Sequence, residues 1–141
     1  NMKIIINIFL FLVLTFSNLF AGEIIVKVNN IEEMDGLIHF ALYDDPKSFP
    51  EDSGKKIGLV EDTIEVYKNG LVIKNLEESY YAIAIYHDEN SNNKFDTFLS
   101  IPKEKYGFSN DAPVFLGPPE FEDAAFLLKK NEKIQIEISL R

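Results

Sequence analysis

The residues best suited to chemistry lie in one short polar segment, residues 88–96. Oxygen-bearing side chains recur at every second position, and a further carboxylate follows. Such spacing lets a curled loop point several oxygens inward, as Ca²⁺ requires. We expect the ligands, with the lysine contributing its main-chain carbonyl, to be Asp88, Asn90, Asn92, Lys94 and Asp96. The apolar run before them, residues 80–86, is typical of a core strand.

The segment fits most of an EF-hand calcium loop but departs from it at the end. Position 6, usually glycine, is Asn93, and asparagine tolerates positive φ well. Position 12 is Leu99, so the bidentate carboxylate must come from elsewhere; Glu104 and Asp111 are the nearest later candidates. Few charged ligands predict a weak Kd, about 10⁻⁴ to 10⁻³ M. The alternative is a metal-free loop in which Asn and Asp side chains bond to backbone amides.

Catalytic groups are scarce. His39 is expected to be a solvated strand residue, and His87 lies at a strand end on the face shared with Ile83 and Ile85. A zinc site needs three or four ligands, and the chain has two histidines and no cysteine. None of four serines occupies a nucleophile elbow: Ser79, Ser91, Ser100 and Ser109. The sequence therefore predicts a protein that is not an enzyme.

A second candidate site is the aromatic segment 106–110, which belongs to a long loop. Exposed aromatic side chains on loops can contact a peptide or a glycan, which makes Tyr106 and Phe108 candidate partner-binding residues. The alternative is that both rings fold back onto the core. If the polar and aromatic segments belong to one continuous loop, a bound cation would order that loop and fix these two rings in place.

The elements that must position these sites are β-strands, because apolar residues alternate with a period of two. The expected strands are residues 24–28, 37–43, 63–67, 71–76, 80–86, 124–128 and 134–140. Asn69-Gly70 predicts a hairpin between the third and fourth of them, and a single helical turn is expected near residues 119–123. About seven short strands predict an all-β sandwich with two long loops, residues 44–62 and 89–112.

The first 21 residues have the layout of a secretory signal peptide. Lys3 precedes a short apolar block, and cleavage is expected after Ala21, leaving one β-sandwich domain, residues 22–141. A retained anchor helix is the alternative, although the block is short for a span of ~20 residues. We expect export to the periplasm, the cell surface or the medium, without stable membrane insertion. A formal net charge of −9 disfavours nucleic acid as a partner and favours cations.

Several blocks of this sequence occur together, in order, in one group of proteins. The most specific are Tyr81-Ala82-Ile83-Ala84-Ile85-Tyr86-His87-Asp88-Glu89-Asn90 and Tyr106-Gly107-Phe108-Ser109-Asn110. On these blocks the chain resembles the DUF2141 family, small exported bacterial proteins without an assigned function. A shorter similarity of residues 72–88 to transthyretin-like and carboxypeptidase-regulatory-like domains implies an Ig-like or prealbumin-like sandwich. Neither resemblance implies a reaction.

Two functions are compatible with these features. The first is an exported, non-catalytic binding module whose loop, residues 88–112, is ordered by Ca²⁺ and recognises a protein, peptide or glycan. The second is a structural or accessory domain of the cell envelope that does not depend on a metal. Melting curves with EDTA and with excess Ca²⁺ separate the two.

Overall fold

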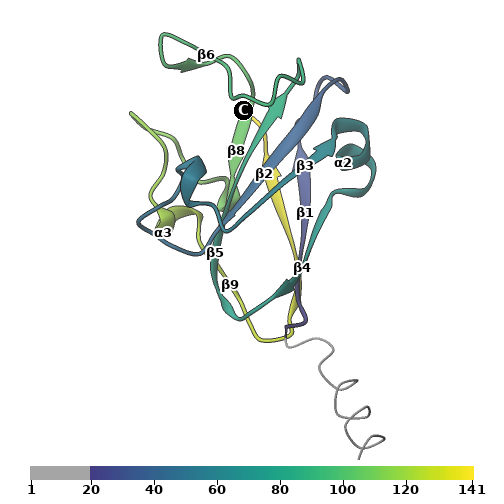
Figure 1. Ribbon diagram of the computed structural model, residues 1–141, viewed down its shortest axis with the longest axis vertical. Helices are drawn as coiled ribbons and strands as arrows, with labels where there is room; N and C mark the ends of the chain where they lie inside the picture. Colours follow the sequence, from purple (N-terminus) through teal and green to yellow (C-terminus); the bar gives the residue numbers. More distant parts are fainter. Residues whose placement is uncertain (1–19) are drawn as a thin grey trace, which may run out of the picture.

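The computed structural model describes residues 20–141 and shows two β-sheets packed as a sandwich (Figure 1). The smaller sheet has the order β10–β1–β4, and its strands are β1 (Gly22–Asn29), β4 (Leu71–Leu76) and β10 (Lys133–Ser139). β1 is antiparallel to β4 and parallel to β10, so the last strand lies beside the first. The predicted all-β sandwich is confirmed.

The larger sheet has the order β3–β2–β5–β8, with β9 pairing with the start of β5. Its strands are β2 (Leu37–Tyr43), β3 (Ile57–Asp62), β5 (Ser79–Asp88), β8 (Tyr106–Phe108) and β9 (Phe126–Leu128). A small hairpin projects from the sandwich and consists of β6 (Thr97–Phe98) and β7 (Ile101–Pro102). The described residues thus hold ten strands, more than the seven expected, because the two predicted long loops carry four of them.

Alternation along the strands places one set of side chains between the two sheets. The inner face of the larger sheet contributes buried apolar residues from β2 and β5, including Ile38, Phe40, Ile83 and Ile85. They pack with residues of the smaller sheet such as Ile24, Val26, Ile73 and Ile138. The residues between these positions point outward, because successive side chains of a strand lie on opposite faces.

The segment predicted as the third strand is instead a helix, α2 (Thr63–Asn69). Asp62 caps it by accepting a backbone N–H of the first turn at 2.9 Å, and Gly70, with φ of 68°, ends it. Val66 is the buried anchor of the helix. The prediction was wrong because it rested on Asn69-Gly70 as a hairpin turn between two strands, whereas Gly70 ends the helix. Asp62 followed three residues later by Glu65 is a helix-start signature that outweighs the hairpin signal.

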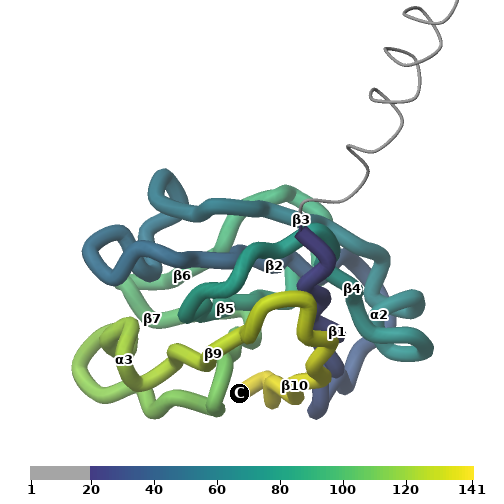
Figure 2. Tube along the Cα trace, turned by 90° about the horizontal axis from the view of Figure 1, so that it is seen from below, coloured from purple at the N-terminus to yellow at the C-terminus, as the bar shows by residue number. Residues whose placement is uncertain are grey.

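Loops cover part of the outer face of the larger sheet, the face that points away from the smaller sheet. Phe49 is central there, and its ring lies 5.2 Å from that of Tyr43, 5.8 Å from Phe108 and 5.9 Å from Phe121. Phe121 opens the predicted single turn, α3 (Phe121–Ala124), and two 3₁₀ turns accompany it, η1 (Asp52–Gly54) and η2 (Ser109–Asp111). Figure 2 shows α3 and α2 on opposite sides of the molecule.

The start of the described chain carries no spanning element. The predicted signal peptide lies outside the described residues except for its last two positions. Gly22, which follows the expected cleavage position, opens β1. Neither α2 nor α3 has the length or the apolar character of a transmembrane segment.

Candidate functional site

The predicted ligand residues curl into a loop at the end of β5, and Asp88 anchors this loop from inside. Asp88 is fully buried. Its Oδ1 accepts the backbone N–H of Asn92 at 3.1 Å, and its Oδ2 accepts that of Asn93 at 2.8 Å. Asn93 has a φ of 60°, the left-handed conformation expected at this position. One buried carboxylate therefore sets the curl of the whole loop.

The two asparagines direct their amide N–H groups at Asp96. Nδ2 of Asn90 donates to Asp96 Oδ2 at 2.9 Å, and Nδ2 of Asn92 donates to the same oxygen at 2.8 Å. These bonds hold the pKa of Asp96 below its usual value, and the bond from Asn90 has the largest effect. Oδ1 of Asn92 accepts the backbone N–H of Lys94 at 2.9 Å. The bonds from backbone N–H groups to Asp88 and Asn92 are of the kind that the alternative expects. In residues 20–141 no three or more His, Cys, Asp or Glu side chains are arranged to hold a metal ion.

Of the two later candidates for the missing carboxylate, only Glu104 reaches the loop. Its Oε2 accepts the backbone N–H of Asp96 at 3.0 Å. Asp111 is engaged elsewhere, because its Oδ1 accepts the backbone N–H of Ser139 at 2.8 Å. Glu104 lies just before β8, so the loop and the aromatic segment are joined through it.

His39 is not the solvated strand residue that the sequence suggested. Its Nε2 lies 3.0 Å from Oδ2 of Asp88, and its ring stacks on Tyr86 with 4.4 Å between the centroids and 11° between the planes. The register explains both contacts, because His39 pairs with Tyr86 across β2 and β5. These contacts attach the loop of residues 88–96, the polar loop, to the outer face of the larger sheet.

His87 lies on the opposite, inner face, as predicted, and is buried. Its Nε2 is 2.7 Å from the carbonyl oxygen of Asp35, so this nitrogen must carry the hydrogen and donate. The Thr63 hydroxyl is 3.3 Å from the same nitrogen and 3.2 Å from the same carbonyl. A nitrogen that donates to a carbonyl cannot also accept a proton from Thr63. The arrangement joins β5 to the start of α2 and does not form a catalytic pair.

A groove of about 950 Å³ crosses the outer face of the larger sheet. Its floor is a row of small residues that pair across three strands, Gly58 on β3, Ala41 on β2 and Ala84 on β5. The neighbouring row is large and consists of Val60, His39, Tyr86 and Tyr106. This step in side-chain size makes a trough that runs across three strands, roughly 10 Å, and ends at Phe108 on β8.

The polar loop supplies one lip of the groove through Asn93, Lys94 and Phe95. The ring of Phe95 lies 5.3 Å from that of Tyr86 and 6.1 Å from that of Tyr106. Tyr106 thus lines the groove as a half-buried wall. The other predicted contact residue, Phe108, is buried on the core, so it is not an exposed loop aromatic.

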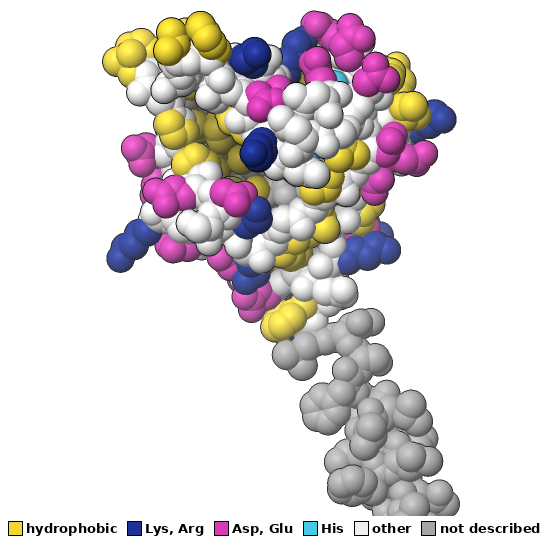
Figure 3. Space-filling view, turned by 45° about the horizontal axis from the view of Figure 1, so that its top comes forward, with side chains coloured by type: hydrophobic (Ala, Val, Ile, Leu, Met, Phe, Trp, Pro, Cys, Tyr) yellow, Lys and Arg dark blue, Asp and Glu magenta, His cyan; other side chains and the backbone are white. Residues whose placement is uncertain are grey.

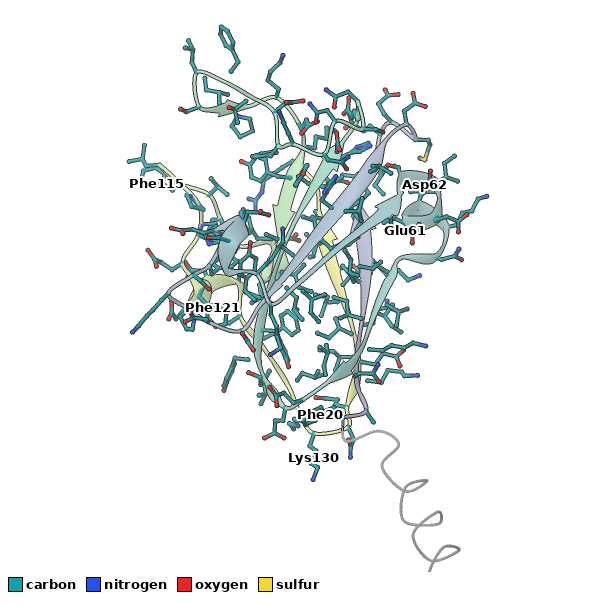
Figure 4. All side chains as sticks on the ribbon, in the orientation of Figure 1. Phe20, Glu61, Asp62, Phe115, Phe121 and Lys130 are labelled. Atoms are coloured by element: carbon teal, nitrogen blue, oxygen red, sulfur yellow. The ribbon has the colours of Figure 1, made fainter. Side chains whose placement is uncertain are left out.

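Two apolar tips, which sequence reasoning missed, flank the mouth of the groove. One is formed by Phe98, Leu99 and Ile101 around the β6–β7 hairpin, and the other by Phe115 and Leu116. Their exposed fractions run from 65% for Phe98 to 96% for Leu116. Both leucines have positive φ, 49° and 53°, a costly conformation for a bulky residue. Figure 3 shows hydrophobic side chains lining a hollow below one tip, and Figure 4 shows Phe115 projecting from the body.

The aromatic wall lies in a negative field. Burial raises the pKa of the Tyr86 hydroxyl to about 12, and the nearby carboxylates of Asp88 and Glu104 add to the rise. The hydroxyl makes no hydrogen bond within the described residues, so it is free to bond a ligand. Burial is the main reason that the pKa of Glu104 is raised, and the nearby carboxylate charges of Asp96 and Asp88 raise it further.

A family model described as an uncharacterized protein conserved in bacteria, DUF2141, matches residues 26–136. The chain belongs to the DUF2141 family. The match takes in the polar loop and every residue that lines the groove of this DUF2141 chain. No curated protein and no solved structure matches the chain. The Ig-like or prealbumin-like kinship of the sandwich therefore stays a prediction.

Proposed function

We propose that this protein is an exported, non-catalytic binding module that holds a segment of a protein, a peptide or a glycan in the groove. The row of small residues beside a row of larger ones carries this proposal. A flat sheet face would expose all its rows alike, whereas here Ala41 and Ala84 leave room for a ligand. At the β3 end of the row, the side chain of Lys55 lies over Gly58. The groove volume lies within the range of ordinary ligand sites.

The lining suits a ligand with both apolar and polar parts. Aromatic rings of Tyr86, Phe95 and Tyr106 form one wall, while Asn93 and Ser100 bring polar groups to the lip. The two exposed apolar tips extend the contact area beyond the groove, as at surfaces that bind proteins. A partner that lies along the trough would cover them and relieve the exposure of Leu99 and Leu116.

A binding role also agrees with how the reactive groups are engaged. His39 is bonded to Asp88, and Nε2 of His87 donates to a backbone carbonyl. Neither histidine faces a nucleophilic hydroxyl that it could deprotonate, and this supports a non-catalytic protein. The layout of residues 1–21 supports export.

The groove can be tested by filling it. Mixtures of peptides and of oligosaccharides would be titrated into ¹⁵N-labelled protein, and we expect shifts at the floor and at the aromatic row. Ala84→Phe places a ring on the floor and should weaken any such binding at least tenfold. Tyr67→Ala, an exposed aromatic on α2 outside the groove, is the matched control.

Two outcomes would contradict the proposal. Binding that maps to another surface, or that Ala84→Phe leaves intact, would show that the groove is not the site. Absence of binding from both mixtures, with a melting temperature that ignores EDTA and Ca²⁺, would favour the structural domain of the cell envelope instead.

A further inference from the structure

Glu104 carries a carboxylate oxygen without a partner. The side chain is only 8% exposed, and although Oε2 accepts the backbone N–H of Asp96, Oε1 is buried and makes no hydrogen bond in the described structure. No lysine, arginine or histidine of residues 20–141 forms an ion pair with it. A buried carboxylate without a counter-charge is costly, so this oxygen is available to a proton or to a cation.

Glu104 also lies near the acidic groups of the polar loop. Glu104 is bonded to the backbone of Asp96, and the charges of Asp96 and Asp88 both act on it. Asp88 is fully buried as well, and its side chain accepts two N–H groups and contacts His39. A carboxylate offers about four lone-pair sites, so Asp88 retains capacity for one more bond.

The asparagines already supply positive charge to the third carboxylate of the loop. Asn90 and Asn92 direct N–H groups at Asp96. Their side-chain carbonyl oxygens accept backbone N–H groups, that of Asn90 from Asn92 and that of Asn92 from Lys94. An amide oxygen has two lone pairs, so each can also face an ion without losing its backbone bond.

We propose that the loop binds a divalent cation of the Ca²⁺ class and that Glu104 supplies the carboxylate that position 12 lacks. The ligands would come from the side chains of Asp88, Asn90, Asn92, Asp96 and Glu104, with the carbonyl of Lys94. The donors are all oxygens, which suits Ca²⁺ better than zinc or copper. Since no three acidic side chains are already arranged around one point, binding must draw the loop closer together.

The site would act on the groove through Phe95. This residue stands between Lys94 and Asp96, and its ring packs on Tyr86 and Tyr106. Closure of the loop on an ion would therefore fix one lip of the groove. This coupling rests on the proposed function, whereas the cation site itself does not.

The test compares Glu104→Gln with the parent, by calorimetry and by melting with 1 mM EDTA or 10 mM CaCl₂. The parent should bind Ca²⁺ with Kd of about 10⁻⁴ to 10⁻³ M and melt several degrees higher in Ca²⁺. Glu104→Gln keeps the shape and the bond to Asp96 but removes a buried charge. It should melt no lower in EDTA and should lose at least tenfold in Ca²⁺ affinity. Glu122→Gln, an exposed acid on α3, is the matched control.

A second readout uses Tb³⁺, whose luminescence is sensitised by a nearby tyrosine such as Tyr86. Emission should appear in the parent, be displaced by Ca²⁺ and be lost in Glu104→Gln. No heat with 10 mM Ca²⁺, or equal affinity in Glu104→Gln, would overturn the cation site. Ca²⁺ binding that leaves Phe95 as mobile as before by ¹⁵N relaxation would overturn only the coupling.

Discussion

The two faces of the larger sheet are built from the same strands and meet different surroundings. On the inner face, Ile83 and Ile85 alternate along β5 and are sealed by the smaller sheet. On the outer face, Ala84 and Tyr86 come from the same stretch but are covered only by loops, and a groove is left between them and those loops. One face is closed by a sheet of fixed spacing, and the other is only partly covered by loops.

This difference explains why small and aromatic residues gather outside. A sheet packed on a sheet needs branched side chains of similar size to fill about 10 Å between layers. A loop can adapt its height to the row beneath it, so the outer face tolerates alanine beside tyrosine. The outer face is incompletely covered and can bind a partner, whereas the sealed inner face provides most of the stability.

The largest expected effect separates the two faces directly. Ile83→Ala removes a fully buried side chain and should lower the free energy of unfolding by about 2–5 kcal/mol. Ala84→Leu, one residue later on the outer face, should change it by less than about 1 kcal/mol, because the groove can accept the added atoms. Urea denaturation of both variants measures the difference. Similar losses would show that the outer face is packed as tightly as the inner one.

The histidines provide the next comparison. His87→Asn loses the hydrogen bond to the Asp35 carbonyl inside the sandwich and should cost about 1–3 kcal/mol. His39→Asn should cost less, because Asp88 keeps its two backbone N–H bonds and the site is partly open. Thermal melts at pH 7.5 report both changes. A larger loss for His39→Asn would place the main stabilising contact outside.

A smaller effect concerns Tyr43, where the outer face is covered. Burial, followed by the charge of Asp52, raises the pKa of the Tyr43 hydroxyl to about 12. The neutral form is thus favoured in the folded state, so its contribution is complete below pH ~10 and is lost as the pH rises toward about 12. Tyr43→Phe should cost about 1 kcal/mol at pH 7, through the lost bond to the Pro50 carbonyl, and should flatten the alkaline fall. Urea titrations at pH 8, 10 and 11 check this, and an unchanged alkaline slope would contradict it.

The smallest expected effect has the opposite sign. Leu116 is almost fully exposed and has a positive φ, so Leu116→Gly should raise stability by roughly 0.5–1 kcal/mol. The same change removes an apolar tip beside the groove and should weaken partner binding. Calorimetric melting measures the first effect. A loss of stability would mean that Leu116 packs against the rest of the protein in solution and is not available to a partner.

The strands were predictable because burial on one side imposes alternation. Ile24 to Val28 and Ile134 to Leu140 show it clearly, and both form strands of the smaller sheet. The helix at Thr63–Asn69 was missed although Asp62 and Gly70 mark its ends. The hairpin signal of Asn69-Gly70 was given more weight than the capping signals. β3 was missed for a related reason, since an edge strand with Gly58 and Val60 outward shows little alternation.

The candidate site was predictable only in part. The loop residues from Asp88 to Asp96 were found because their spacing is local. The groove was not, because Gly58, Ala41 and Ala84 come together only through strand register, and small residues carry no signal of their own. Glu104 could be suggested from the sequence, but its unpartnered oxygen appears only once the loop is folded.

The ends of the described chain set the direction in which this protein would face. Phe20 and Lys130 lie at one pole, and the β6–β7 hairpin lies at the other (Figures 1 and 4). At that second pole the backbone of Arg141 pairs with that of Tyr106, beside the aromatic wall. If the polypeptide were attached to a surface ahead of Phe20, the β6–β7 hairpin would point away from that surface and be accessible to a partner. A tag added after Arg141 would emerge next to that wall and could obstruct it.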